Sequence, residues 1–219
     1  TEAGTVMVAD INTTAARASS QPFGFTFFNG ALYFSALDGV SGFELWKTDG
    51  TTAGTVRVRD INTTAGNSSQ PFLYTVFNGA LYFSAFDDVS GFELWKTDGS
   101  EAGTVRVKDI NMSAVIGSEP FDFIVFNGAL YFSADDGVNG RELWKTDGTD
   151  VNTVMAADIN TTAAGAGSFP DGLTVLNGAL YFDASDGVNG IELWKTDGTA
   201  DGTGMVKDIC GGACDSAEC

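Results

Sequence analysis

One block of sequence occurs four times in this chain and constrains the fold more than any other feature. The segment Glu44–Gly50 reads ELWKTDG, and the same letters return around Trp95, Trp144 and Trp194. Successive tryptophans are therefore 49, 49 and 50 residues apart. A fixed period of this size is typical of stacked copies of one supersecondary unit. We expect an array of equivalent units that presents a repeated surface.

Each repeat contains four short segments with strand character. In the first repeat they cover residues 22–28, 31–36, 43–48 and 55–61. Asn29-Gly30 separates the first two segments, and Asn-Gly is the strongest short hairpin signal because both turn residues must reach positive φ. Strict alternation would place Phe23, Phe25 and Phe27 on one face of the first strand.

A four-stranded antiparallel meander that recurs about every 50 residues is typical of the blades of a β-propeller. The sequence therefore predicts an all-β, β-propeller-like array of four blades, at about residues 21–61, 70–110, 119–159 and 169–209. Together they would form a single repeat domain of residues 1–209, followed by a tail at residues 210–219. An open stack of the same sheets is the alternative to a closed ring.

The Val-x-Val-x-Asp-Ile segment that ends each blade has a fifth copy, at residues 4–11. It predicts one surplus strand at the N-terminus. Two explanations compete: the chain is a fragment of a longer array, or the strand is donated to a neighbouring subunit. A head-to-tail contact of this kind that does not close gives a filament.

Charge and composition exclude several functions. The formal net charge is −18, which disfavours nucleic acid as a partner. The chain has no histidine, so histidine-based catalysis and histidine metal sites are absent. The sequence has no apolar run long enough for a membrane span. Cys210, Cys214 and Cys219 lie together in the tail and suggest one disulfide and one remaining thiol.

The Glu-Leu-Trp-Lys-Thr-Asp-Gly-Thr segment resembles the signature of the ELWxxDGT-repeat proteins, which are long secreted or surface-exposed bacterial chains. The matches are Glu44–Thr51, Glu93–Ser100, Glu142–Thr149 and Glu192–Thr199, with Ser100 as the departure. The resemblance implies a propeller-like β fold and an extracellular or cell-surface setting. It implies no reaction.

The four tryptophans are candidate carbohydrate-binding residues, because an aromatic ring repeated on every blade can stack on sugars: Trp46, Trp95, Trp144 and Trp194. The competing interpretation is that they are core residues. Glu44 shares the strand with Trp46, and a charge pair between Glu44 and Lys96 of the next blade would explain the repeated Glu-x-x-Lys.

Acidic residues recur around the Gly-rich loops and are candidate calcium ligands. They are Asp38, Glu44, Asp87, Asp88, Glu93, Asp136, Glu142, Asp186 and Glu192. Their spacing matches no defined calcium loop, and aspartates in turns usually bind their own backbone. No cofactor is required by this pattern.

Asparagines in Asn-x-Ser/Thr sequences are candidate glycosylation sites: Asn12, Asn62, Asn67, Asn111 and Asn160. They fall in the loops that link blades, which should be exposed.

The copies are nearly equivalent and no unique catalytic constellation stands out, which argues against an enzyme. The sequence predicts an extracellular structural or adhesive repeat protein whose partners are other copies of itself. The alternative is a multivalent carbohydrate-binding propeller with one weak site per blade and glycans as partners.

Overall fold

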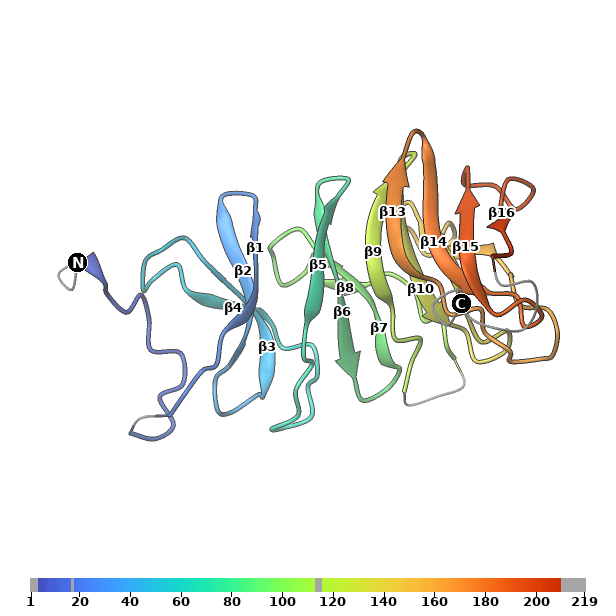
Figure 1. Cartoon of the computed structure of the whole chain (residues 1–219). Helices are drawn as coiled ribbons and strands as arrows, with labels where there is room; N and C mark the ends of the chain where they lie inside the picture. The colour runs from blue at the N-terminus through green and yellow to red at the C-terminus, as the bar shows by residue number, and fades with distance from the viewer. Residues whose placement is uncertain (1–3, 17, 113–115, 210–219) are drawn as a thin grey trace. The chain divides into compact units, whose positions relative to one another are not determined.

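The computed structural model of the chain describes residues 4–16, 18–112 and 116–209 (Figure 1). These residues form sixteen β-strands in four separate four-stranded sheets. Within each sheet the strands pair antiparallel and in chain order. The predicted all-β, propeller-like array of four blades is therefore confirmed, and every strand falls within the blade bounds expected from the sequence.

The chain divides into two compact units, residues 1–106 and 107–219, where the sequence predicted one domain. Each unit contains two sheets. The first unit has β1 (Phe23–Phe28), β2 (Ala31–Leu37), β3 (Phe43–Thr48) and β4 (Val56–Arg59) in one sheet, and β5 (Phe72–Phe77), β6 (Ala80–Asp87), β7 (Gly91–Thr97) and β8 (Val105–Arg106) in the other.

The second unit repeats this plan. Its first sheet contains β9 (Phe121–Phe126), β10 (Ala129–Asp135), β11 (Arg141–Thr146) and β12 (Val154–Ala157). Its second sheet contains β13 (Asp171–Leu176), β14 (Ala179–Ser185), β15 (Ile191–Thr196) and β16 (Gly204–Lys207).

The Asn-Gly hairpins form as predicted. Asn29 has φ 46° and Gly30 has φ 78°, and the turn closes on the Phe28–Ala31 pair of β1 and β2. The same positive φ values recur at the other three Asn-Gly turns. Asparagine and glycine tolerate this region better than other residues, so these residues set the register of the first two strands of every sheet.

The strict alternation expected for β1 is wrong. The register shifts between Phe23 and Thr26, and Gly24 in the bulge has φ 69°. A bulge inserts one residue and re-aims the side chains beside it. Phe23 consequently packs on Phe43, and Phe25 packs on Phe34.

Neighbouring sheets within a unit pack face to face, and this contact supplies the core. In the first unit one apolar cluster contains Leu45 and Val58 from the first sheet and Leu81, Phe83 and Trp95 from the second. In the second unit an equivalent cluster joins residues of β9–β12 to residues of β13–β15. Each sheet thus buries one apolar face against the other sheet of its unit, because an isolated sheet would leave that face in water.

The prediction of a surplus strand at residues 4–11 is wrong. Among the described residues, this segment pairs with no strand, and the first strand begins at Phe23. The segment lies across a face of the first sheet instead. Val8, Ala9 and Ile11 line a hollow with Phe25 and Phe34, and the Thr52 hydroxyl donates to the Val8 carbonyl. In the other copies this segment contains β4, β8, β12 or β16, which pairs with the Glu-Leu-Trp strand of its own repeat.

Of the residues described, none belongs to a helix with the length and hydropathy of a membrane span.

Candidate functional site

The repeated glutamate of the Glu-Leu-Trp strand fastens the segment that links one sheet to the next. Glu44 begins this contact from β3, where its side chain is fully buried. Its Oε2 accepts hydrogen bonds from the Ile61 N–H at 2.9 Å and the Ser69 hydroxyl at 2.6 Å. Its Oε1 accepts from the Ser69 N–H at 3.1 Å. The linking segment that runs from β4 to β5 is therefore tied to β3 at both ends.

The second unit contains the same arrangement at Glu142. The Ile159 N–H donates to its Oε2 at 2.9 Å, and the Ser168 N–H donates to its Oε1 at 2.9 Å. The Ser168 hydroxyl also donates to Oε2. We call this arrangement of a buried glutamate with the isoleucine and serine of the following linker the glutamate clamp.

Burial controls the ionisation of the clamp. Desolvation raises the pKa of Glu44 to about 7, although the bonds from Ser69 and Ile61 favour the charged form. Burial raises the pKa of Glu142 as well, although the hydrogen bonds from Ser168 and Ile159 act to lower it. The expected Glu44–Lys96 charge pair is not what satisfies Glu44, because its oxygens bind backbone and serine donors.

The lysine of the same strand makes the second polar contact between neighbouring sheets. Lys47 Nζ donates to the Gly99 carbonyl at 2.8 Å, and Lys145 Nζ donates to the Gly198 carbonyl at 2.8 Å. A Cβ at Gly99 would overlap the Tyr33 hydroxyl, so only glycine fits this turn. The Lys-Thr-Asp-Gly part of the repeat therefore joins a strand of one sheet to the Asp-Gly turn of the next.

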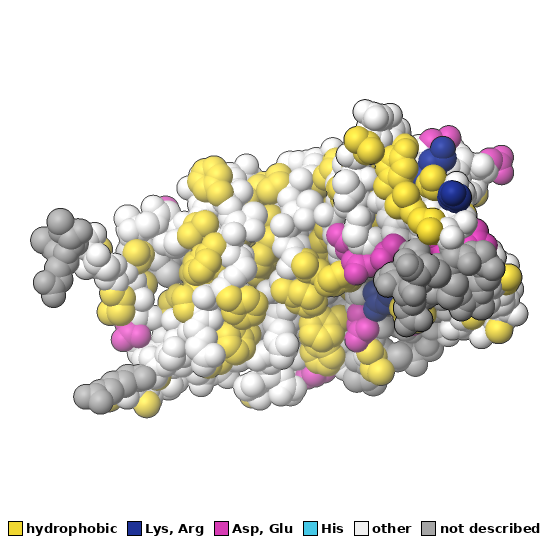
Figure 2. Space-filling model, in the orientation of Figure 1, with side chains coloured by type: hydrophobic (Ala, Val, Ile, Leu, Met, Phe, Trp, Pro, Cys, Tyr) yellow, Lys and Arg dark blue, Asp and Glu magenta, His cyan; other side chains and the backbone are white. Residues whose placement is uncertain are grey.

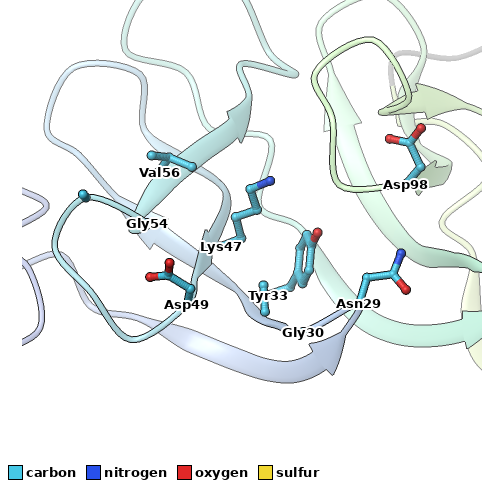
Figure 3. Close-up of a pocket in the computed structure, with 10 residues that line it drawn as sticks. Asn29, Gly30, Tyr33, Lys47, Asp49, Gly54, Val56 and Asp98 are labelled. Atoms are coloured by element: carbon cyan, nitrogen blue, oxygen red, sulfur yellow. The ribbon is translucent and has the colours of Figure 1, made fainter.

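A hollow of about 450 Å³ opens beside this contact in the first unit. Asn29, Tyr33, Lys47, Asp49 and Asp98 supply its polar lining. In Figure 3 the Lys47 amine and the Tyr33 hydroxyl point toward the turn that carries Asp98. The lining offers one cation, two carboxylates and a hydroxyl, which suits a small polar ligand better than an apolar one.

The carboxylates of the hollow also build their own turns. Asp49 Oδ1 accepts from the Thr51 N–H and hydroxyl, and Asp98 Oδ1 accepts from the Ser100 N–H and hydroxyl. These hydrogen bonds lower the pKa of both aspartates, and the bonds from the Thr51 and Ser100 hydroxyls have the largest effect. The groups stay charged near neutral pH and are unsuited to donating a proton.

The four tryptophans lie in the third strand of each sheet, which is β3, β7, β11 or β15. Trp95 and Trp144 are buried, and Trp46 and Trp194 are half-buried. Trp95 belongs to the apolar cluster of the first unit, and Trp194 packs against that of the second. All four indole N–H groups lack a hydrogen-bond partner among the described residues. The side chains of Trp95 and Trp194 therefore contribute to packing between the sheets of their units.

The loop acids are not gathered into a metal centre. Asp38 Oδ1 accepts from the Val40 and Ser41 N–H groups, and its Oδ2 lies 3.3 Å from Arg57. Asp87, Asp136 and Asp186 cap their loops in the same way. Asp88 binds the amides of Asn62 and Asn67.

The repeated glutamates, Glu44, Glu93, Glu142 and Glu192, are buried. Within the described ranges, no three acidic or cysteine side chains stand close enough to hold an ion.

The linking-loop asparagines were expected to be exposed, and that expectation is wrong for four of the five. Asn12, Asn62, Asn111 and Asn160 are between 2% and 8% exposed. Their amides donate to carbonyls inside the linker, for example Asn12 to Ser19 at 3.1 Å and Asn160 to Gly167 at 3.1 Å. A short polar side chain that closes its own loop buries itself.

Asn67 alone among the five candidates is exposed, and its amide donates to Asp88 at 3.0 Å. The three tail cysteines, Cys210, Cys214 and Cys219, lie outside the described residues.

The sequence reasoning missed the serine of the clamp. Ser69 and Ser168 stand two residues before a proline, as do Ser20 and Ser118. A serine at one position of all four repeats, among linkers that otherwise vary, was the available signal.

No protein-family profile and no curated protein sequence matches the chain. Among solved structures it is similar to puromycin hydrolase, with a TM-score of 0.55 at 15% identity over 91% of this chain. A mutant of that enzyme, S511A complexed with PGG, gives a TM-score of 0.53 at 17% identity over 88% of this chain. The chain spans 30% of the length of those structures. This likeness shows the fold alone.

The catalytic domain of an alpha-L-arabinofuranosidase, GH62 from Coprinopsis cinerea, is also similar. Its TM-score is 0.39 at 12% identity, over 92% of this chain and 74% of that chain. At this TM-score the similarity carries no structural argument.

Proposed function

We propose that the chain is a structural repeat protein that works outside the cell by associating with other copies of itself. The observation that carries this proposal is how the repeated polar residues are used. The glutamates, lysines and aspartates of the signature join sheets or close turns. Repeated polar residues that join one sheet to the next are what a structural protein built from repeats requires.

The sheet faces support the same role. Association by apolar sheet faces repeats the contact that already holds each unit together. The resemblance to ELWxxDGT-repeat proteins supports an extracellular or surface setting. Electron microscopy of the purified full chain tests the proposal, with elongated assemblies expected and uniformly single particles contradicting it.

Carbohydrate binding is the second candidate, and the polar hollow favours it. The first unit brings Asn29, Tyr33, Lys47 and two aspartates to one opening. In the second unit Lys145 binds Gly198, and Asn127 Nδ2 donates to the Asp197 carbonyl at 3.2 Å. Binding to a glycan array that Tyr33→Phe weakens, with unchanged thermal unfolding, would support this function over the first.

A hydrolytic role has weaker support. Puromycin hydrolase is an enzyme by name, but this chain spans only 30% of it. Asp38, Asp98 and the clamp glutamates Glu44 and Glu142 accept hydrogen bonds from turn and linker donors, so these carboxylates are not positioned as a free acid and base pair. Absence of turnover on ester, amide and aryl-glycoside substrates is the expected result.

A further inference from the structure

Among the residues that the structure describes, one face of the fourth sheet is left exposed, although the same face is buried in the first sheet. Four apolar positions show the difference. They are Phe28, Leu45, Val58 and Ile61 in the first sheet, between 0% and 6% exposed, and Leu176, Leu193, Val206 and Ile209 at the fourth, between 42% and 59% exposed. Figure 2 shows hydrophobic side chains over the β13 and β14 region. We call these four residues the open face.

The glutamate clamp beside the open face is incomplete. Glu192 is 1% exposed, and its Oε2 accepts from the Ile209 N–H at 3.3 Å. Its Oε1 is buried and has no hydrogen-bond partner among the described residues. The corresponding Oε1 atoms of Glu44 and Glu142 accept the serine N–H of the next linker. A buried carboxylate oxygen without a donor is destabilising, so this site is built for a donor it lacks.

The first sheet carries the matching serine. Ser20 stands where Ser69 and Ser168 stand in later repeats, and its carbonyl accepts from the Leu37 N–H at 2.8 Å, as theirs do from Phe86 and Ser185. Among the described residues this is the bond that Ser20 makes, so its N–H and hydroxyl have no acceptor. Among the described residues, the glutamate of the fourth sheet thus lacks a donor, and the serine that precedes the first sheet lacks an acceptor.

The first sheet is also only partly covered on the side that carries Ser20. Phe25 is 57% exposed, whereas Leu173 at the same position of the fourth sheet is 6% exposed and belongs to the cluster between sheets. Residues 8–11 cover this side loosely and leave a hollow of about 230 Å³. Val6 and Met7, which precede this segment, are 78% and 76% exposed.

We propose that the open face binds the first sheet of a second copy of the chain, head to tail, with Glu192 of one copy accepting the N–H and hydroxyl of Ser20 of the next. This proposal rests on the proposed function and specifies the contact through which the copies associate. The interface continues the one inside each unit, with β16 of one copy taking the place that residues 8–11 hold on the other. Because the two surfaces differ, the contact is heterologous, and it gives a filament where successive copies do not close into a ring.

The test blocks each end separately with an acid at an exposed apolar position. Leu193→Asp blocks the open face, and Phe25→Asp blocks the first sheet. Val138→Asp is the matched control, because Val138 is 66% exposed in the loop between β10 and β11 and belongs to neither the first nor the fourth sheet. Sedimentation velocity of the full chains, with reductant to exclude disulfide links, follows the assembly, and circular dichroism checks folding.

The wild type and Val138→Asp should form chains of copies, and each blocked variant alone should weaken association at least roughly tenfold. An equimolar mixture of the two blocked variants should form dimers and nothing larger, because one intact end of each remains. Ser20→Ala should weaken wild-type association by roughly fivefold.

Three results separate the failures. A wild type that stays monomeric up to millimolar concentration overturns both the contact and the proposed function. Association that neither blocked variant changes overturns this contact and leaves the function standing. A mixture of blocked variants that stays monomeric shows that the two ends do not bind each other.

Discussion

At the scale of the residue, the clamp glutamate is a buried acid held by neutral donors. Its raised pKa means that the folded state disfavours the charged form. The stability that Glu44 contributes is therefore fully present below its ordinary pKa and is lost as the pH rises through about 7. The aspartates with lowered pKa act in the opposite direction, which is why a variant comparison is needed.

We expect the free energy of unfolding of the wild type, relative to Glu44→Gln, to fall by up to about 3 kcal/mol between pH 5 and pH 8. Urea unfolding followed by tryptophan fluorescence measures it. Glu101→Gln is the control, because Glu101 is exposed and lies in the same unit. A wild-type-minus-variant difference that stays flat across this range would mean that Glu44 is not desolvated.

Gly24 shows why one residue type is required at the bulge of β1. Its φ is 69°, and a Cβ there would lie 2.9 Å from the Tyr74 ring of the neighbouring sheet. Gly172 has φ 66° at the same position of β13, with nothing within 4 Å of a Cβ.

Gly24→Ala should therefore lose more stability than Gly172→Ala. The second variant should lose about 1 kcal/mol from positive φ alone, and the first about 2 kcal/mol or more because the ring must move. Thermal unfolding of the two variants side by side gives the comparison. Equal losses would show that the sheets do not approach as closely as described.

At the scale of the element, the linker between sheets is a folded part of the structure. Its asparagine closes the loop and its serine reaches the clamp, so both ends of the linker are fixed by buried hydrogen bonds. This explains why the sequons at Asn12, Asn62, Asn111 and Asn160 recur at one position without needing a glycan.

Expression in a host with N-glycosylation should therefore add a glycan at Asn67 and leave the four buried asparagines bare. Intact mass before and after glycosidase treatment measures the number, and Asn67→Gln should abolish the modification. Glycans on Asn62 or Asn160 of the folded protein would contradict the burial of the linker.

The strands were predictable from sequence because their signals are local. Asn-Gly turns and apolar alternation fixed the number of strands and most of their bounds. The bulge at Gly24 and Leu73 escaped, because one inserted residue is invisible to an alternation pattern. The clamp also escaped, because Glu44 and Ser69 lie 25 residues apart and meet only through the packing of sheets.

At the scale of the whole molecule, charge opposes association. The chain carries a formal net charge of −18, so copies repel one another at low ionic strength. An apolar contact completed by Ser20 and Glu192 contains no opposite-charge pair that salt would weaken.

Association of the wild type should therefore strengthen as sodium chloride rises from 0.02 M to 0.5 M, by roughly tenfold or more, because salt screens the repulsion. Light scattering at fixed protein concentration records it. Dissociation by salt would indicate that ion pairs hold the copies together and would exclude the apolar contact.

The most direct test concerns the clamp, because it fastens the linker at the junction between sheets in each unit. Hydrogen exchange by mass spectrometry, on peptides covering residues 61–70 and 159–169, compares the wild type with Glu44→Gln. We expect slow exchange of both peptides in the wild type, and loss of protection at residues 61–70 alone in the variant. Fast exchange of residues 61–70 in the wild type, or protection that the substitution leaves unchanged, would contradict it.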